Sequence, residues 1–143
     1  MMTPDELKRR TRQFALRVIR LAEALPRSRA ADVIGRQLVR SGSSVGANYR
    51  AACRARSNAD FIAKMSIVEE EADETVYWLE LLVDSKMVSA PALQPLLKEA
   101  NELLAITVAS VNTARGKRRQ GGPATSAVSR CKSAIRNPQS AIE

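Results

Sequence analysis

The sequence contains no histidine, and this absence excludes several classes of chemistry. Imidazole is the usual general base of hydrolases and a common zinc ligand, so no Ser-His-Asp or Cys-His arrangement can form. A Gly-x-x-x-x-Gly-Lys-Ser/Thr loop is also missing, and with it the usual phosphate cradle of nucleotide hydrolases. We therefore expect a protein that is not an enzyme, with no catalytic residues and no cofactor.

A metal site would have to be built without imidazole. Glu71 and Glu74 lie one helical turn apart, as carboxylates of a di-iron site in a helical bundle do. Such sites also need Glu-x-x-His pairs on two helices, which this chain lacks. Cys53 and Cys131 have no metal-ligand spacing and are too few for a disulfide framework. We expect no bound metal and a reducing, cytoplasmic location.

Aromatic residues are scarce, with 2 Phe, 2 Tyr and 1 Trp among 143 residues. The core must therefore consist of Leu, Ile, Val and Ala, a composition that favours packed helices over a sheet sandwich. No stretch approaches the roughly 18 uncharged apolar residues of a transmembrane helix. The N-terminus is charged from Asp5 onward and lacks the apolar region of a signal peptide. We expect one all-α domain that has no membrane association.

Capping signals and apolar periodicity predict four helices. Thr3, Pro4 and Glu6 form a helix start with a capping box. Apolar residues then recur in alternating steps of four and three as far as Leu25, which is the spacing of left-handed bundle packing. Similar patterns follow, and the predicted helices cover residues 4–25, 30–56, 59–85 and 91–115. We predict an up-and-down antiparallel four-helix bundle over residues 1–115.

Glycine and proline leave two details of this bundle open. Gly42 and Gly46 lie inside the second predicted helix, where each costs about 1 kcal/mol relative to alanine. Their spacing of four puts them on one side, so they either let a neighbouring helix approach closely or mark a kink or break at residues 41–46. Pro95 would lose a hydrogen bond in the first turn of the last helix, which moves its expected start to near Ala92.

The C-terminal segment differs in composition from the predicted bundle. Residues 116–143 are rich in Gly and Ser, lack apolar periodicity, and carry six basic residues against one acid. Such a composition cannot bury enough apolar surface to offset the entropy of ordering. We predict a disordered basic tail.

Charge is divided along the chain. Residues 4–57 hold 13 Lys and Arg against 4 Asp and Glu, whereas residues 58–115 hold 4 against 10. The net charge of +8 and the isoelectric point near 10.2 favour polyanionic partners such as nucleic acid. At about 100° per residue, the second predicted helix presents one basic stripe opposite its apolar residues. We predict that nucleic acid binds this stripe and the first helix: Arg36, Arg40, Arg50, Arg54, Arg9 and Arg20.

Apolar residues outside the predicted core seams suggest a subunit interface. Leu16 and Ile19 lie about 120° to 180° from the seam of the first helix. Trp78 and Leu81 form a second apolar strip on the third helix, and Ile106 is similarly displaced on the fourth. Single exposed apolar residues are normal on monomers, so a monomer is the competing interpretation.

Two segments resemble a known family. They are LVRSGSSVGANYRA at residues 38–51 and EADETVYWLELL at residues 71–82, with Asp60-Phe61 between them. Together they resemble the four-helix bundle proteins first noticed as reading frames inside intervening sequences of bacterial large-subunit ribosomal RNA genes, the 23S rRNA intervening-sequence proteins. The resemblance covers about residues 5–115 and implies an up-and-down bundle, assembly as a ring-shaped homopentamer, and no catalytic residues.

A related branch of that family comprises accessory proteins of diversity-generating retroelements, which bind nucleic acid and a reverse transcriptase through a basic pentamer surface. The resemblance thus implies other copies of the chain, RNA or DNA, and a reverse transcriptase or other protein as partners. Arg40 and Arg50 flank the first motif, where pairing with Glu71 or Glu74 is a structural alternative to ligand binding. Arg36 and Arg54 are therefore the better candidates for polyanion contact.

Two functions follow as hypotheses. The first is a non-enzymatic, oligomeric helical bundle that binds the RNA or DNA backbone through its basic surface. The second is a protein-interaction scaffold, assembled by pairing of basic and acidic faces without nucleic acid.

Overall fold

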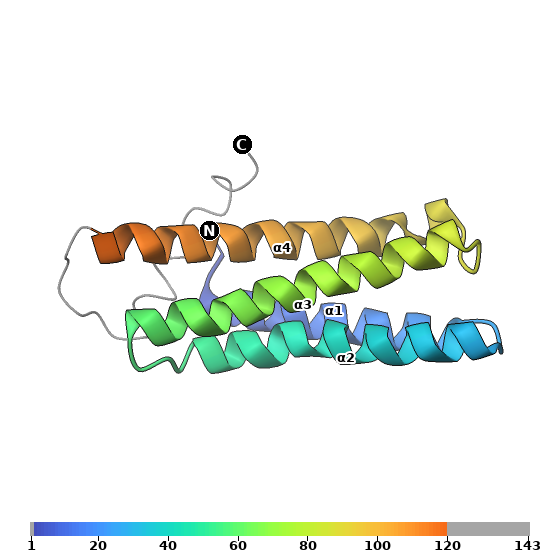
Figure 1. Cartoon of the computed structure of the whole chain (residues 1–143), viewed down its shortest axis with the longest axis horizontal. Coiled ribbons are helices and arrows are strands. Elements are labelled where there is room, and N and C mark those ends of the chain that lie inside the picture. The colour runs from blue at the N-terminus through green and yellow to red at the C-terminus, as the bar shows by residue number, and fades with distance from the viewer. Residues whose placement is uncertain (1, 120–143) are drawn as a thin grey trace.

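The computed structural model describes residues 2–119, which fold into four helices with no strand among them. The helices run alternately up and down (Figure 1). They are α1 (Pro4–Ala24), α2 (Arg29–Ala52), α3 (Asn58–Asp84) and α4 (Ala90–Arg119). The predicted all-α four-helix bundle is confirmed. Over the same residues, none of the helices combines the length and apolar character needed to cross a membrane.

Side-chain caps define where the first three helices begin. The Thr3 backbone N–H donates to Glu6 Oε2 at 2.6 Å, and the Glu6 N–H donates to Thr3 Oγ1 at 3.2 Å. This reciprocal pair is the predicted capping box, and it satisfies two donors that the helix cannot pair internally. Ser28 and Ser57 cap α2 and α3, each accepting a backbone N–H from three residues onward.

The second helix is shorter than predicted. It ends at Ala52 and not near residue 56, because the backbone tightens there. The N–H groups of Arg54 and Ala55 donate to carbonyls three residues back, each at 3.0 Å. Ala55 is buried by this turn, so the chain leaves the helix early to cover the end of the core.

The fourth helix is longer than predicted at both ends. It begins at Ala90, upstream of the expected Ala92, and the Leu93 N–H donates to the Ser89 carbonyl at 3.2 Å. The first turn of α4 is therefore already hydrogen-bonded before Pro95, which has no backbone N–H to donate. The helix continues to Arg119, because the basic residues after Gly116 are good helix formers. The predicted domain boundary at residue 115 thus falls inside a helix, and residues 120–143 of the predicted tail lie outside the described residues.

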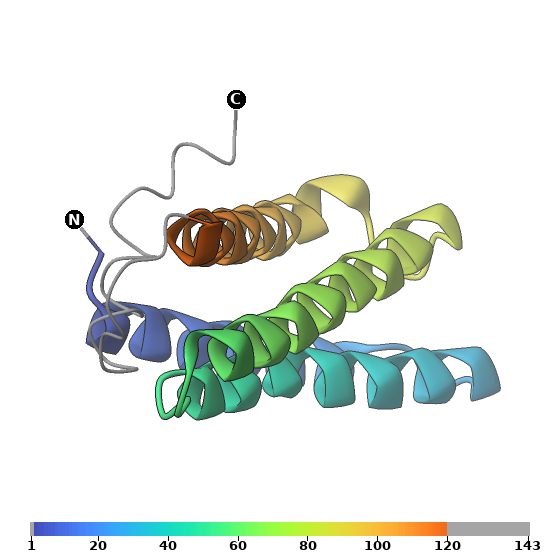
Figure 2. The same cartoon turned by 60° about the vertical axis from the view of Figure 1, so that its left-hand side comes forward.

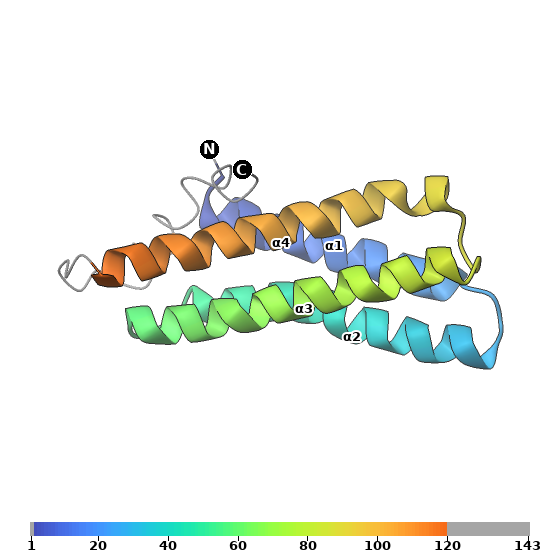
Figure 3. The same cartoon turned by 45° about the horizontal axis from the view of Figure 1, so that its top comes forward.

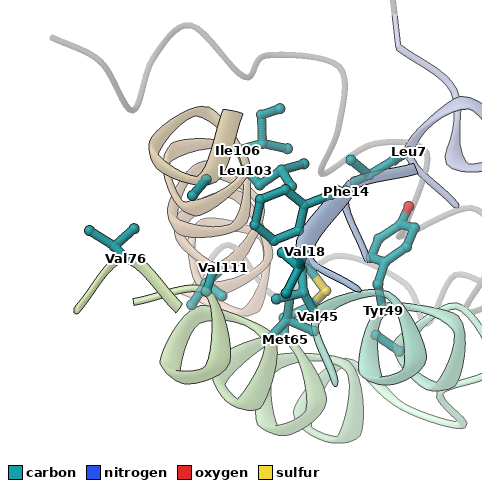
Figure 4. Packing of buried hydrophobic residues seen from close by; sticks show 14 of the residues in the cluster. Leu7, Phe14, Val18, Val45, Tyr49, Met65, Val76, Leu103, Ile106 and Val111 are labelled. Atoms are coloured by element: carbon teal, nitrogen blue, oxygen red, sulfur yellow. The ribbon is translucent and has the colours of Figure 1, made fainter. Parts of the chain in front are cut away.

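Helices that follow one another in the chain pack along their lengths, whereas α1 and α4 touch over a shorter stretch (Figures 2 and 3). Ile106 of α4 lies in this shorter contact, beside Leu103 and near Phe14 of α1 (Figure 4). Its exposed fraction is 6%, so the prediction that Ile106 is displaced from the core is wrong. A helix in a four-helix bundle packs against two neighbours, so its buried face is wider than one seam.

The rotation of α4 decides which of two adjacent leucines is buried. Leu96 and Leu103 are buried, whereas their neighbours Leu97 and Leu104 are only half-buried. The sequence offers two adjacent leucines at both places, so periodicity could not distinguish the two rotations.

Two glycines set the distance between α1 and α2. A Cβ at Gly42 would lie 2.9 Å from Val18 Cγ1, and a Cβ at Gly46 would lie 3.1 Å from Thr11 Oγ1. Because α2 is continuous through both positions, the alternative of a break in the helix is wrong, and the close approach is confirmed. The helices α1 and α2 therefore lie close together along this contact.

Candidate nucleic-acid interface

The six predicted nucleic-acid-binding residues are all exposed. They do not form a single continuous surface, because the rotation of α2 places its arginines beside different neighbours. Arg40 lies against α3, whereas Arg50 lies beside α1. The predicted set therefore has to be divided by location.

A groove of about 430 Å³ between α1 and α2 is lined by four cations. Lys8, Arg9 and Arg12 line it from α1, and Arg50 lines it from α2. We call this hollow the basic groove. No acidic residue occurs among its described lining residues, so every charged side chain of this lining is a cation.

The floor of the basic groove is small and apolar. Ala15 contributes from α1, and Gly46 and Ala47 contribute from α2. Short side chains at these positions leave room between the helices, and the long basic side chains form the rims. Sequence analysis missed Lys8 and Arg12, although their spacing of four on the flank of the α1 seam was a signal that could have identified them.

Three cations of the basic groove are available for a ligand. Arg9, Arg12 and Arg50 form no ion pair with any other residue in the described part of the chain. Lys8 Nζ lies 3.8 Å from Asp5 Oδ1, and Asp5 is 82% exposed. An exposed pair at that distance contributes little, so Lys8 also stays accessible to an anion.

Arg40 has a different role. Its Nη1 donates to Glu71 Oε2 at 3.2 Å, and its Nη2 binds the Glu74 carboxylate. The cross-helix pairing considered for Arg40 is therefore confirmed, and it ties α2 to α3. The same pairing considered for Arg50 is wrong, because Arg50 lies on the α1 side of α2.

The remaining predicted arginines do not line the basic groove. Arg20 and Arg54 are exposed and form no ion pair with another described residue. Arg36 lines a separate hollow of about 670 Å³ near the turn that joins α1 to α2. That hollow has charges of both signs: Glu23, Asp32, Arg27, Arg36 and Arg40. It is therefore less attractive to a polyanion than the basic groove.

Arg10 does not join its neighbour Arg9 on the basic surface. Its Nε donates to both carboxylate oxygens of Glu99 at 3.0 Å, and its guanidinium also binds Glu102. The hydrogen bond that Arg10 donates to Glu99 is the largest cause that raises the Arg10 pKa, against the opposing effect of burial. Arg10 thus joins α1 to α4 across the bundle.

The α3–α4 side of the bundle carries the opposite charge. A hollow of about 450 Å³ is lined by Glu69, Glu70 and Asp73 with half-buried Leu104 and Val108. Within residues 2–119, no three His, Cys, Asp or Glu side chains are grouped so that they could hold a metal ion. The acidic residues therefore form a charged surface, and this surface lies away from the basic groove.

The predicted interface residues differ in exposure. Leu16 and Ile19 are 36% and 39% exposed. Trp78 and Leu81 are half-buried, and Trp78 packs against the core. Tyr77, which sequence analysis did not select, is 54% exposed and meets Trp78 edge to face at a centroid distance of 5.1 Å.

Comparison with known proteins identifies a family and solved structures that resemble this chain. The family model described as "23S rRNA-intervening sequence protein" matches residues 6–109. A crystal structure at 1.70 Å of a protein with unknown function from the S23 ribosomal protein family of Bacteroides thetaiotaomicron VPI-5482 is 35% identical. The match has a TM-score of 0.70 and covers 74% of this chain and 98% of that chain. None of the curated proteins matches.

Proposed function

Because this chain belongs to the 23S rRNA-intervening sequence protein family, we propose that it is a non-enzymatic, oligomeric bundle that binds the RNA or DNA backbone through the basic groove. The crystallised relative is itself described as having unknown function, so the support comes from this chain's own residues. We place this activity in the cytoplasm.

One observation carries the proposal. Four cations converge on one groove, and no acid lines it among the described residues. Phosphates are the anions that such a surface attracts most strongly, because each neutralised phosphate releases condensed counterions. A ligand that engages all four cations would give a slope of about −3 to −4 in a plot of log K against log salt.

The test compares two variants that lose equal charge. The first replaces Arg9, Arg12 and Arg50 by Gln in the basic groove. The matched control replaces three exposed cations of the α3–α4 side, Lys86→Gln, Lys98→Gln and Arg115→Gln. Binding of labelled RNA and DNA is measured by fluorescence anisotropy over a salt series.

The two variants are expected to behave differently. The groove variant loses affinity and its salt slope becomes shallower by about one for each cation removed, while the control keeps both within error. Equal losses in the two variants would show that only net charge matters. Unchanged binding in the groove variant would reject the site.

Assembly is the second element of the proposal. Leu16 and Ile19 are exposed apolar residues on the outer side of α1, and they support an interface between copies of the chain. The family resemblance makes a homopentamer the expected assembly, and a reverse transcriptase or another protein remains a predicted partner. The mass of the assembly, measured by light scattering, tests the subunit number.

The scaffold hypothesis is favoured by one observation of its own. The acidic hollow beside α3 and the basic groove beside α1 carry complementary charge, so the groove of one copy could pair with the hollow of another. In that case high salt would dissociate the assembly, and purified protein would carry no nucleic acid. A salt-resistant assembly that co-purifies with nucleic acid would reject the scaffold.

A further inference from the structure

One hollow of the bundle combines apolar and acidic side chains. It is the hollow of about 450 Å³ between α3 and α4, which we call the acidic hollow. Leu104 and Val108 line it from α4 and are only half-buried. The carboxylates that line it from α3 form no ion pair with any other residue between residues 2 and 119: Glu69, Glu70 and Asp73. The acidic hollow therefore offers apolar area beside unpaired negative charge.

A matching occupant needs projecting apolar side chains with cations beside them. Apolar side chains gain free energy when they cover the half-buried leucine and valine, and cations complement the carboxylates. The basic groove of another copy supplies only the cations. Its uncharged lining consists of short side chains and one glycine, namely Thr11, Ala15, Ser43, Gly46 and Ala47. Such a lining has no large apolar side chain that could enter the acidic hollow.

The sequence after α4 contains a stretch with both properties. Residues 116–143 as a whole lack apolar periodicity, but within residues 124–135 the apolar positions follow the i, i+3, i+4, i+7 pattern: Ala124, Ala127, Val128, Cys131, Ala134 and Ile135. At about 100° per residue these six positions share one face about 120° wide, with Cys131 at its centre. Arg130 flanks this face on one side, and Lys132 and Arg136 flank it on the other. The stretch contains no acid, so its charge is complementary to that of the acidic hollow.

The same stretch is within reach of the acidic hollow of its own chain. α4 ends at Arg119, which is eleven residues beyond Val108, or about 16 Å of helix. Cys131 is twelve residues beyond Arg119, and twelve residues span about 18 Å as a helix and more when extended. Gly121 and Gly122 lie between them and permit the chain to reverse. A short linker gives the stretch an effective concentration on the order of millimolar at the hollow.

We propose that residues 124–136 dock on the acidic hollow of their own chain. Their apolar face covers Leu104 and Val108, and their cations lie beside the carboxylates of α3. Docking at this hollow is independent of the nucleic-acid site, which lies between α1 and α2. It also covers the surface that the scaffold hypothesis requires, so the basic groove of another copy cannot pair with it.

Disulfide trapping in the full chain tests this contact. Cys53→Ala leaves Cys131 as the one native thiol, and Ser66→Cys adds a second thiol in the acidic hollow. The control variant carries Ser43→Cys in the basic groove instead. A disulfide requires Cα atoms within about 7 Å of each other, so its yield in a glutathione redox buffer reports how often the two sites meet.

The yield is converted to an effective concentration by comparison with the reaction of each thiol with glutathione. Non-reducing electrophoresis separates a bond within one chain from a bond between two chains. We expect the effective concentration within one chain to be at least about tenfold higher for Ser66→Cys than for Ser43→Cys, a difference worth about 1.4 kcal/mol. Thermal unfolding confirms that each variant is folded.

Two further pairs of variants test the charges and the apolar face in the Ser66→Cys background. Glu69→Gln with Asp73→Asn should lower the effective concentration, and the equal charge loss of Glu23→Gln with Asp32→Asn, near the α1–α2 turn, should not. Ile135→Gln should lower it as well. Ile142→Gln is its control, because Ile142 lies outside the docking stretch.

Three results would overturn the proposal. The first is an equal effective concentration for Ser66→Cys and Ser43→Cys. The second is a disulfide that forms mainly between two chains, which would assign the acidic hollow to a second copy. The third is a preference for Ser66→Cys that neither the acid pair nor Ile135→Gln reduces. Each of these results leaves the proposed function in place, since that function is tested by the salt series on the basic groove.

Discussion

The side chain of Val18 on α1 occupies the space that a side chain at Gly42 on α2 would need. An added Cβ would lie 2.9 Å from Val18 Cγ1 and 3.0 Å from Val18 Cγ2, closer than carbon atoms normally pack. Val18 is completely buried, so it cannot move aside into solvent. This contact sets how closely α1 and α2, the two helices that line the basic groove, approach each other.

Replacing Gly42 by Ala should destabilise the protein although alanine is the better helix former. The gain in helix propensity is about 1 kcal/mol, and overpacking a rigid core costs typically about 1–3 kcal/mol. Gly35 provides the matched control, because its added Cβ would lie 3.5 Å from Leu25 Cδ1, an ordinary contact. Chemical denaturation should show that Gly42→Ala lowers the free energy of unfolding and Gly35→Ala raises it. Stabilisation by both substitutions would show that α1 can move away from α2.

Replacing Arg10 by Gln should weaken the contact between α1 and α4. Arg10 and Glu99 are 26% and 18% exposed, so the substitution leaves a largely shielded carboxylate without its main partner. Hydrogen bonds to charged groups contribute about 1.5–3 kcal/mol, and we expect a loss near the lower end, measured by urea denaturation. Lys8→Gln is the control, since the Lys8–Asp5 pair is exposed and long. Equal effects of the two substitutions would contradict a structural role for Arg10.

The turn between α2 and α3 should become less stable at low pH, because the Asp60 carboxylate is protonated there. Its carboxylate accepts from Lys64 Nζ at 2.8 Å and from the Arg56 N–H at 3.2 Å, and these bonds, led by Lys64, lower its pKa below the usual value of 3.8. A pKa lowered by folding adds stability that is complete above the unfolded-state pKa and is lost as the pH falls through the folded-state pKa. The carboxyl titration followed by NMR should therefore have its midpoint below 3.8.

Asp60→Asn provides the corresponding stability measurement. The variant should lose less stability than the wild type between neutral pH and pH values below 3.8, because the titrating carboxylate is gone. Asp73→Asn, at an exposed position without an ion pair among the described residues, should follow the wild-type pH dependence. A wild-type pH profile in Asp60→Asn would contradict the assignment.

Replacing Leu16 and Ile19 by Gln should reduce the mass of the assembly without unfolding the subunit. Both side chains are exposed, so their loss removes apolar area from an interface but none from the core. Val33→Gln is the control, because Val33 is 55% exposed on α2. Light scattering and thermal unfolding report the two properties separately. An assembly of unchanged mass would place the interface elsewhere on the subunit.

Local patterns in the sequence were enough to predict the number, order and approximate extent of the helices. Thr3 and Glu6 formed the expected capping box, because capping depends on residues three apart in the chain. The packing role of Gly42 and Gly46 was also accessible from their spacing. The predicted helix ends were wrong by a few residues in two places. The second helix ends earlier than predicted, at Ala52, because a backbone turn follows it. The fourth helix ends later, at Arg119, because good helix formers follow Gly116.

Only the tertiary structure shows which of the predicted arginines bind carboxylates and which line the basic groove. Periodicity placed Arg40 and Arg50 on one stripe, but Arg40 binds Glu71 and Glu74 while Arg50 borders the basic groove. Lys8 and Arg12 belong to the site because α1 packs against α2, which the sequence pattern did not predict in detail. The choice between Leu96 and Leu97 for the core likewise depended on how α4 is rotated toward its neighbours.

Apolar spacing and caps thus specify helices from within each segment, because both act over one or two turns of the chain. Which cation is neutralised, which leucine is buried and where charges converge depend on the relative rotation and register of separate helices. Those quantities arise from the packing of side chains such as Val18 against Gly42, which lie far apart in sequence. The sequence alone therefore predicted the four-helix bundle, whereas the basic groove could be identified only from the packing of α1 against α2.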